Sequence, residues 1–221
     1  VSTQSTGAKV LEYITYSIHV GSKLILLQKM QKTESCTGIS LKTQLLYGLV
    51  FMQRYISQLF NFTFEFIYFL KLFLLGSTIY TIYLIAFKYK GAYQADLDKS
   101  PVSILIITSY VLAIILARPW KFSQIIWTSS ILLETVSMIP QFQMLVNSKN
   151  IDNFTGNYVA ALAGYRIVYL VYFIALLFSD DGANLSWIVW VSTIVQSILN
   201  AEFLYYWVKS KMQHTDVKLP K

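Results

Sequence analysis

The sequence contains very few side chains of the kinds that bind metals or form disulfides. Cys36 is its only cysteine, and His19 and His214 are its only histidines. An intrachain disulfide is therefore excluded, and a zinc site is not expected. The sequence also lacks a recognisable pair of nucleophile and base, a phosphate-binding loop and a cluster of metal ligands. These absences argue against an enzyme and against a bound cofactor.

Charged residues are scarce as well. They make up 13% of the chain, whereas an ordinary soluble domain has about 25%. Hydrophobic residues make up 55% of the chain, and the mean hydropathy is +0.51. A soluble domain of 221 residues could not bury that much apolar surface. We therefore predict an all-α integral membrane protein that is surrounded by the lipid bilayer.

The net charge of +7 does not indicate a nucleic-acid-binding protein. Such a protein gathers its lysines and arginines on one face of a soluble fold. Here they lie in short segments between apolar runs and near the C-terminus. We predict no nucleic-acid partner.

Seven apolar segments approach the length of about 20 residues that a helix needs to cross a bilayer. They are Val10–Gln28, Leu41–Phe60, Phe62–Phe87, Pro101–Ala117, Ser123–Val146, Asn157–Phe178 and Asn184–Val208. Residues 1–9 precede them as a short luminal segment that lacks the apolar core of a signal peptide. Residues 209–221 follow them as a basic tail.

Basic residues are divided unequally between the two sides of a seven-span protein. One side receives Lys9, Arg118 and Lys121. The other side receives Lys29, Lys32, Lys42, Lys88, Lys90, Lys99, Lys149 and the four lysines of residues 209–221. Because cytosolic loops are enriched in lysine and arginine, we expect the tail in the cytosol and the N-terminus on the luminal or external side.

The sequence also contains an internal repeat. Gln53-Arg54-Tyr55 lies in the second segment and Gly164-Tyr165-Arg166 in the sixth. The pattern predicts two parallel three-helix repeats, residues 10–87 and 123–208, joined by a linker helix at residues 101–117; transporters use such repeats. Pro140-Gln141, late in the fifth segment, is the dipeptide after which the PQ-loop group is named.

Three charged side chains fall in the middle of apolar segments: Arg54, Glu134 and Arg166. A charge at the centre of a span costs at least ~2.5 kcal/mol unless it is paired or hydrated, so it marks a candidate functional site. Two cations and one anion would leave a positive cavity that suits a carboxylate ligand. The alternative is that Glu134 and Arg166 pair only to hold helices together.

Three further polar residues within or near the spans are ambiguous. We expect Lys23 and Lys71 to extend toward the membrane interface rather than to contact a ligand. His19 lies in the first segment and is either a packed, uncharged residue or a group that responds to pH, because imidazole titrates near neutrality.

With these residues in view, the chain resembles the endoplasmic-reticulum lumen retention (KDEL) receptors, which return escaped proteins bearing a Lys-Asp-Glu-Leu type C-terminus. The similarity runs from about Ile18 to Pro220. It rests on TESCTGIS at Thr33–Ser40, Arg54-Tyr55, WTSSILLE at Trp127–Glu134, Pro140-Gln141, Gly164-Tyr165-Arg166, Tyr169, FLYY at Phe203–Tyr206 and Lys218–Pro220.

The resemblance implies a seven-helix, PQ-loop-like fold with a luminal cavity. Arg54 and Tyr55 would receive the terminal carboxylate of the signal, and Glu134 and Arg166 would form a polar latch beneath it. The ligand-binding residues that the resemblance implies are Arg54, Tyr55, Trp127, Glu134, Tyr165, Arg166 and Tyr169.

The resemblance also implies where and how the protein works. His19 matches the family's pH-sensing histidine, which favours capture of the signal in the Golgi and its release in the endoplasmic reticulum. Lys209 and Lys211 in the tail would meet the retrograde vesicle coat. The expected location is the membrane of the endoplasmic reticulum and the cis-Golgi, and the expected partners are retention-signal peptides.

The chain departs from the family at positions that read the charged side chains of the signal. These positions hold Glu12, Ser57, Gln124, Leu176 and Asn184. Each lost charged contact is expected to cost roughly 1.5–3 kcal/mol. The chain is therefore expected to bind a Lys-Asp-Glu-Leu signal poorly, and to read a different C-terminus or none.

Two alternatives to a receptor stay open. One is an accessory subunit of a larger complex of membrane proteins, in another organelle membrane, that keeps the receptor fold without binding a signal. The other is a PQ-loop transporter of small solutes, which the repeat and Pro140-Gln141 suggest.

Overall fold

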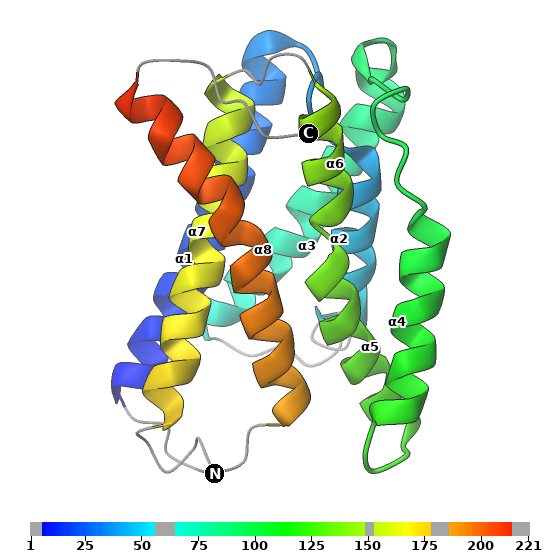
Figure 1. The fold of residues 1–221 in the computed structure, drawn as a ribbon, viewed down its shortest axis with the longest axis vertical. Helices are drawn as coiled ribbons and strands as arrows, with labels where there is room; N and C mark the ends of the chain where they lie inside the picture. The colour runs from blue at the N-terminus through cyan, green and yellow to red at the C-terminus, as the bar shows by residue number, and fades with distance from the viewer. Residues whose placement is uncertain (1–5, 56–64, 149–152, 178–185, 214–221) are drawn as a thin grey trace.

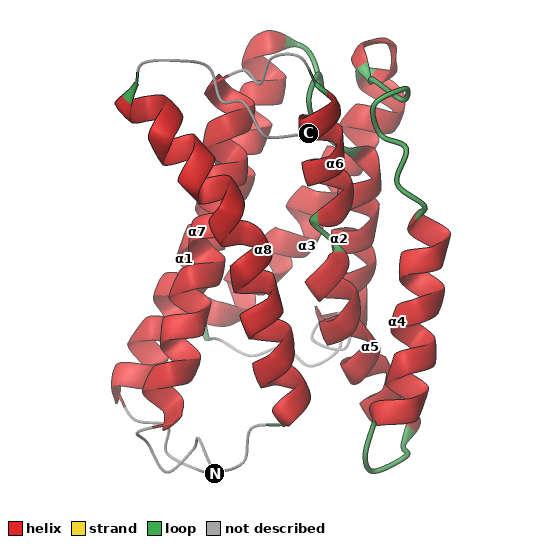
Figure 2. Cartoon of the chain, viewed as in Figure 1, coloured by secondary structure: helices red, strands yellow, loops and turns green. Residues whose placement is uncertain are grey.

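The computed structural model describes residues 6–55, 65–148, 153–177 and 186–213. Within these residues every regular element is a helix (Figure 2). The principal helices are α1 (Thr6–Thr33), α2 (Leu41–Tyr55), α3 (Phe66–Tyr83), α4 (Val102–Leu116), α5 (Phe122–Val136), α6 (Ile139–Asn147), α7 (Asn153–Leu177) and α8 (Trp187–Met212). A π-helical turn (Leu84–Lys88) extends α3, and a short 3₁₀ helix (Lys90–Ala92) follows it.

Four helical stretches of the described chain are long and apolar enough to cross a membrane. They are Phe66–Lys88, Phe122–Asn147, Thr155–Leu176 and Trp187–Met212. The apolar helix α4 is shorter, at 15 residues. Large apolar side chains on the outside of the molecule, such as Phe87, Ile104 and Ile107, are more than half exposed. Lipid can cover these side chains, so the prediction of an all-α protein with several membrane spans is confirmed.

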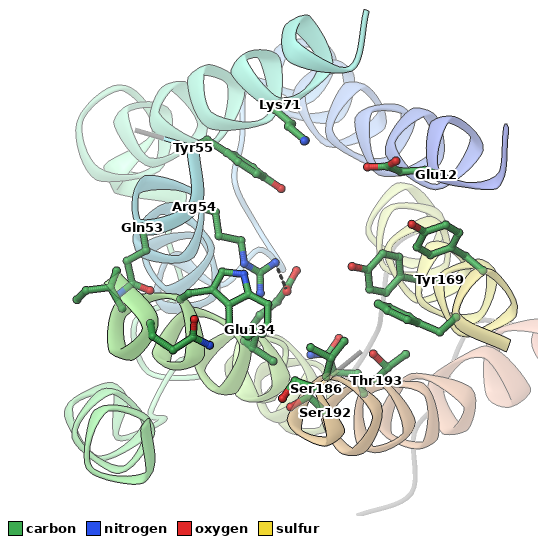
Figure 3. Close-up of a pocket in the computed structure, with 18 of the residues that line it drawn as sticks. Glu12, Gln53, Arg54, Tyr55, Lys71, Glu134, Tyr169, Ser186, Ser192 and Thr193 are labelled. Atoms are coloured by element: carbon green, nitrogen blue, oxygen red, sulfur yellow. Dashed lines mark ion pairs between the residues drawn. The ribbon is translucent and has the colours of Figure 1, made fainter. Parts of the chain in front are cut away.

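The helices form one bundle in which segments far apart in the sequence lie side by side (Figure 1). Helix α1 packs mainly against α7, and α2 packs against α3 and α5. Helix α4 packs against α5 at the edge of the bundle, and α7 packs against α8. This arrangement places α1, α2, α3, α5, α7 and α8 around a common interior, where the candidate site lies (Figure 3).

The predicted segment Ser123–Val146 is divided into two helices. Helix α5 ends at Val136, and α6 begins at Ile139 with Pro140 in its first turn. Proline has no backbone N–H to continue the ladder of hydrogen bonds in a helix, but it is tolerated at a helix start. The break therefore follows from Pro140.

Gln141 ties this break to the connection between α1 and α2. Its side-chain amide donates to the Gly38 carbonyl at 2.8 Å, and its side-chain oxygen accepts from the Ser40 N–H at 3.0 Å. Its own N–H donates to Thr43 at 2.9 Å. Gly38 has φ +78°, a conformation that favours glycine. Gln141 thereby closes one end of the bundle.

Asp98 completes this closed end. Its carboxylate accepts hydrogen bonds from the Ser40 hydroxyl at 2.9 Å, from the Tyr93 hydroxyl at 2.7 Å and from the Lys42 N–H at 3.2 Å. Burial and the bond to Asp98 raise the pKa of Tyr93. These contacts satisfy a carboxylate that is only 3% exposed.

Two lysines lie deeper than expected. Lys23 does not extend to the membrane interface, and that prediction is wrong: its side chain is fully buried, and its ammonium donates to the Gln44 side chain at 2.8 Å. Lys29 is not in a loop, because α1 continues to Thr33. Its ammonium donates to the Thr37 carbonyl at 2.6 Å and to Thr155 on α7. Both lysines lie on the part of α1 that packs inside the bundle.

We expect the Cys36 thiol to resist maleimide labelling in the folded protein. The side chain is fully buried, its S–H donates to the Tyr89 carbonyl at 3.3 Å, and burial raises its pKa. Both effects make the reactive thiolate scarce and inaccessible. Labelling should accelerate only as the protein unfolds with temperature. Rapid labelling of the folded protein, before any loss of helical circular dichroism, would contradict this arrangement.

Candidate functional site

A cavity of about 1210 Å³ lies inside the bundle. Its lining includes Arg118 before α5 and Ser186 before α8. These residues belong to the end of the bundle where α1, α3, α5 and α8 begin, so the cavity extends to that end (Figure 1). The closed end with Gln141 and Asp98 is opposite. A deep cavity with convergent polar groups is the usual form of a ligand site.

Three charged side chains meet at the base of the cavity. Glu134 on α5 lies between Arg54 on α2 and Arg166 on α7 (Figure 3). A carboxylate oxygen of Glu134 is 2.5 Å from Nη1 of Arg54, and its other oxygen is 2.8 Å from Nη2 of Arg166. The prediction that Glu134 balances the two arginines agrees with this geometry.

Neighbouring polar side chains orient the two guanidinium groups. Nε of Arg54 donates to the Ser130 hydroxyl at 2.9 Å. Nη1 of Arg166 donates to Gln196 on α8, whose amide nitrogen donates to the Thr135 hydroxyl at 3.0 Å. Four helices therefore contribute to one hydrogen-bonded network, in which the buried charges are paired as their desolvation requires.

The two arginines differ in their access to the cavity. The side chain of Arg54 is 19% exposed, whereas that of Arg166 is 3% exposed. Arg54 uses two of its five N–H donors in its bonds to Ser130 and Glu134, so within the described chain it keeps donors for a ligand. Arg54 is the better placed of the two to bind a carboxylate.

Tyrosine and tryptophan side chains form much of the cavity wall. Tyr55, Trp127 and Tyr169, three of the predicted ligand-binding residues, all line it. The Tyr55 hydroxyl is 3.5 Å from the hydroxyl of Tyr16, which also lines the cavity. Trp127 is 40% exposed. Such walls provide apolar contact area with a few polar groups for orientation.

Lys71 is a cavity residue that the sequence interpretation missed. Its side chain points from α3 into the cavity (Figure 3), with the ammonium 5.3 Å from the centre of the Tyr16 ring. The expectation that Lys71 extends to the membrane interface is wrong, because α3 packs beside α1 with this face inward. A lone lysine inside an apolar helix was the available signal.

Two predicted residues lie behind the cavity wall. The ring of His19 stacks on that of Tyr165, with centroids 4.1 Å apart and planes at 12°. Neither residue lines the cavity. The Arg166 guanidinium lies 4.5 Å from the Tyr165 ring, so His19 is one residue removed from the charged network. Within the described chain, Nε2 of His19 has no hydrogen-bond partner.

Lys209 and Lys211 lie far from the cavity, in the last turn of α8. Their ammonium groups are 6.0 Å from the Tyr205 ring and 5.9 Å from the Trp207 ring. Lys32, Lys42, Lys88 and Lys90 belong to the same end of the bundle, opposite the cavity opening (Figure 1). The remaining lysines of the tail lie outside the described residues.

Three of the five positions that depart from the family pattern lie within the described residues. Glu12, Gln124 and Leu176 all line the cavity, so the differences fall where a ligand would contact them. Ser57 and Asn184 lie outside the described residues.

Comparison with known proteins agrees with the geometry of the site. Residues 35–176 match the family described as ER lumen protein retaining receptor. The chain is 36% identical over 204 residues to ER lumen protein-retaining receptor A of Arabidopsis thaliana, an alignment that covers 91% of this chain and 94% of the relative. It is 35% identical over 211 residues to the ER lumen protein-retaining receptor of Dictyostelium discoideum, covering 92% and 95%. The relative from Petunia hybrida is 34% identical over 204 residues, covering 91% and 94%. The family is one of receptors rather than enzymes, and the chain belongs to it.

Proposed function

We propose that the protein is a receptor that binds the C-terminal carboxylate of luminal proteins and returns them from the Golgi to the endoplasmic reticulum. The observation that carries the proposal is the charged network of Arg54, Glu134 and Arg166 at the base of a large cavity. Two guanidinium groups share one carboxylate, which leaves the base of the cavity positive and favours a second carboxylate from a ligand.

The proposed topology has seven spans in two parallel three-helix repeats. Helices α1, α2 and α3 form one repeat, the α5–α6 pair with α7 and α8 forms the other, and α4 is the linker. The position of α4 at the edge of the bundle supports this division. The lysine-rich end faces the cytosol, where Lys209 and Lys211 meet the retrograde coat, and the cavity opens to the lumen.

His19 is the proposed pH-sensing group. Its stacking on Tyr165, next to Arg166, connects the charge of the imidazole to the network at the base of the cavity. The ring of Tyr47 on α2 lies 6.2 Å from that of His19, and the ammonium of Lys23, one turn further along α1, lies 5.6 Å from the same Tyr47 ring. We expect a His19→Gln variant to keep Arg54-dependent binding of peptides that end in Lys-Asp-Glu-Leu. Its affinity for these peptides should no longer differ between about pH 5.5 and 7.4.

The test is binding of the purified protein to peptides ending in Lys-Asp-Glu-Leu and close variants, at about pH 5.5 and 7.4, on either side of the pKa of an unperturbed imidazole. Binding that is stronger at the lower pH and depends on Arg54 would support retrieval of luminal proteins. Absence of binding by every peptide at both pH values would contradict it and favour the accessory-subunit alternative, which the changed residues Glu12, Gln124 and Leu176 in the cavity wall motivate.

A further inference from the structure

A buried lysine, Lys23, lies beside His19 behind the wall of the cavity. It follows His19 by four residues on α1, so the two side chains lie on one face of the helix about one turn apart. His19 is 5% exposed and Lys23 is fully buried. The ring of Tyr47 lies near both groups, 6.2 Å from the imidazole and 5.6 Å from the ammonium, and Tyr165 stacks on the imidazole. Both tyrosines are uncharged near neutral pH, so neither neutralises the lysine.

The contacts of Lys23 favour its charged form. Its ammonium donates to Oε1 of Gln44 at 2.8 Å and lies over the Tyr47 ring. An amide oxygen and an aromatic face both stabilise a cation. The Gln44 amide donates in turn to the Tyr158 hydroxyl at 2.9 Å, which fixes the position of the acceptor. Within the described residues no carboxylate forms an ion pair with Lys23, so its charge acts on its neighbours without a neutralising partner.

The surroundings of His19 are positive before the imidazole takes up a proton. The charged side chains that act on it are, in order of strength, Lys23 on α1, Arg166 on α7, Glu134 on α5 and Arg54 on α2. Glu134 is the single anion in this set, and it is already bonded to both arginines. On α3, Lys71 adds a further cation beside Tyr16, three residues before His19. Lys23 is therefore the charge that most strongly opposes a second cation at His19.

We propose that Lys23 sets the acidity at which His19 is protonated: two cations one turn apart on a buried helix face oppose each other, so the imidazole takes up its proton only at a lower pH than it would without Lys23. This effect exists with or without a ligand. Its consequence for capture rests on the proposed function: the lumen must be more acidic for capture than His19 alone would require, and release is complete at neutral pH.

The experiment measures protonation of His19 directly, without any peptide. His19 and His214 are the only histidines in the sequence, so a His214→Gln protein labelled with ¹³C-histidine gives one imidazole signal by nuclear magnetic resonance. Lys23→Gln removes the charge and keeps a side-chain amide that can bond to Gln44. We expect this substitution to raise the pH of half-protonation of His19 by about one unit or more. An unchanged or lower value would overturn the proposal.

Two control variants separate charge from packing. Lys23→Arg keeps the cation, so the titration of His19 should stay within about 0.3 pH unit of that of the unaltered protein. Lys29→Gln removes another buried lysine of α1, 2% exposed, which lies ten residues or about 15 Å beyond His19. It should also change the titration by less than about 0.3 pH unit. Equal shifts in Lys23→Gln and Lys29→Gln would reflect a change in the bundle rather than a local charge, and would overturn the proposal.

Peptide binding tests the consequence for capture. In Lys23→Gln, the pH at which binding of a Lys-Asp-Glu-Leu peptide falls to half should rise by the same amount as the pH of half-protonation, so binding should persist at about pH 7.4. A shifted titration without peptide binding by any variant would support the role of Lys23 and contradict the proposed function. Peptide binding with an unshifted titration would do the reverse.

Discussion

Replacement of Arg54 by glutamine is expected to weaken the binding of carboxylate-terminated peptides by about a hundredfold or more. Arg54 is the more exposed of the two guanidinium groups at the base of the cavity, and it keeps N–H donors for a ligand within the described chain. Glutamine removes the charge and the bidentate geometry together. The dissociation constant, measured by calorimetry or by fluorescence with a labelled peptide, reports the effect directly.

The C-terminal amide of the same peptide separates loss of the contact from loss of the fold. Against the unaltered protein, amidation should cost about as much as the Arg54→Gln substitution, because each change removes one partner of the same ion pair. Against Arg54→Gln, amidation should cost little more. Arg118→Gln, which removes a guanidinium nearer the opening, should weaken binding much less. If Arg54→Gln and Arg118→Gln were equally damaging, the charged network would not be the carboxylate site.

Glu134→Gln is expected to destabilise the protein by about 3 kcal/mol, near the lower end for breaking a buried ion pair. Glu134 is 8% exposed and is bonded to both arginines. Glutamine fills nearly the same space but leaves two cations without their shared anion. The measurement is the temperature at which Cys36 becomes reactive to a maleimide, since that thiol is buried in the folded protein.

The double variant Glu134→Gln, Arg166→Gln provides the control. Arg166 is the more buried arginine. Its removal together with Glu134 leaves Arg54 as the one remaining charge of the three, whereas Glu134→Gln alone leaves two cations. The double variant should therefore be less destabilised than the sum of the two single variants, by 1 kcal/mol or more. Additive effects would mean that the contacts between Glu134 and Arg166 contribute little to stability.

The charged network was predictable from the sequence because few arrangements can accommodate charges within apolar segments. Arg54, Glu134 and Arg166 each lie in the middle of a predicted span. An unpaired charge in lipid is costly, so residues of opposite sign from different spans are expected to meet. Their pairing required no knowledge of how the helices pack. The cavity positions of Trp127, Tyr55 and Tyr169 came instead from the resemblance to the receptor family.

The positions of Lys23 and Lys71 were not predictable in the same way. Both lie in long apolar helices, where the sequence pattern does not mark which face points inward. A lysine at the lipid surface can extend along its own stem to water, and that alternative is usually favoured. Only the packing of α1 against α7 and α3 shows that Lys23 is enclosed and that Lys71 faces the cavity. The division of the fifth span, by contrast, was indicated by Pro140, but the continuous apolar run around it led to the prediction of a single helix.

The break between α5 and α6 connects two regions that otherwise lie apart. Glu134, at the base of the cavity, and Gln141, at the closed end, are seven positions apart in the sequence, and the break lies between them. A displacement of Glu134 by an arriving carboxylate would therefore reach the bonds of Gln141 through one short, proline-interrupted segment. Linkage between two such regions is reciprocal: a cytosolic protein that binds the closed end more tightly when the cavity is occupied must raise the affinity of the cavity by the same factor. Cargo affinity measured on the isolated receptor would then be lower than its affinity on a coated membrane.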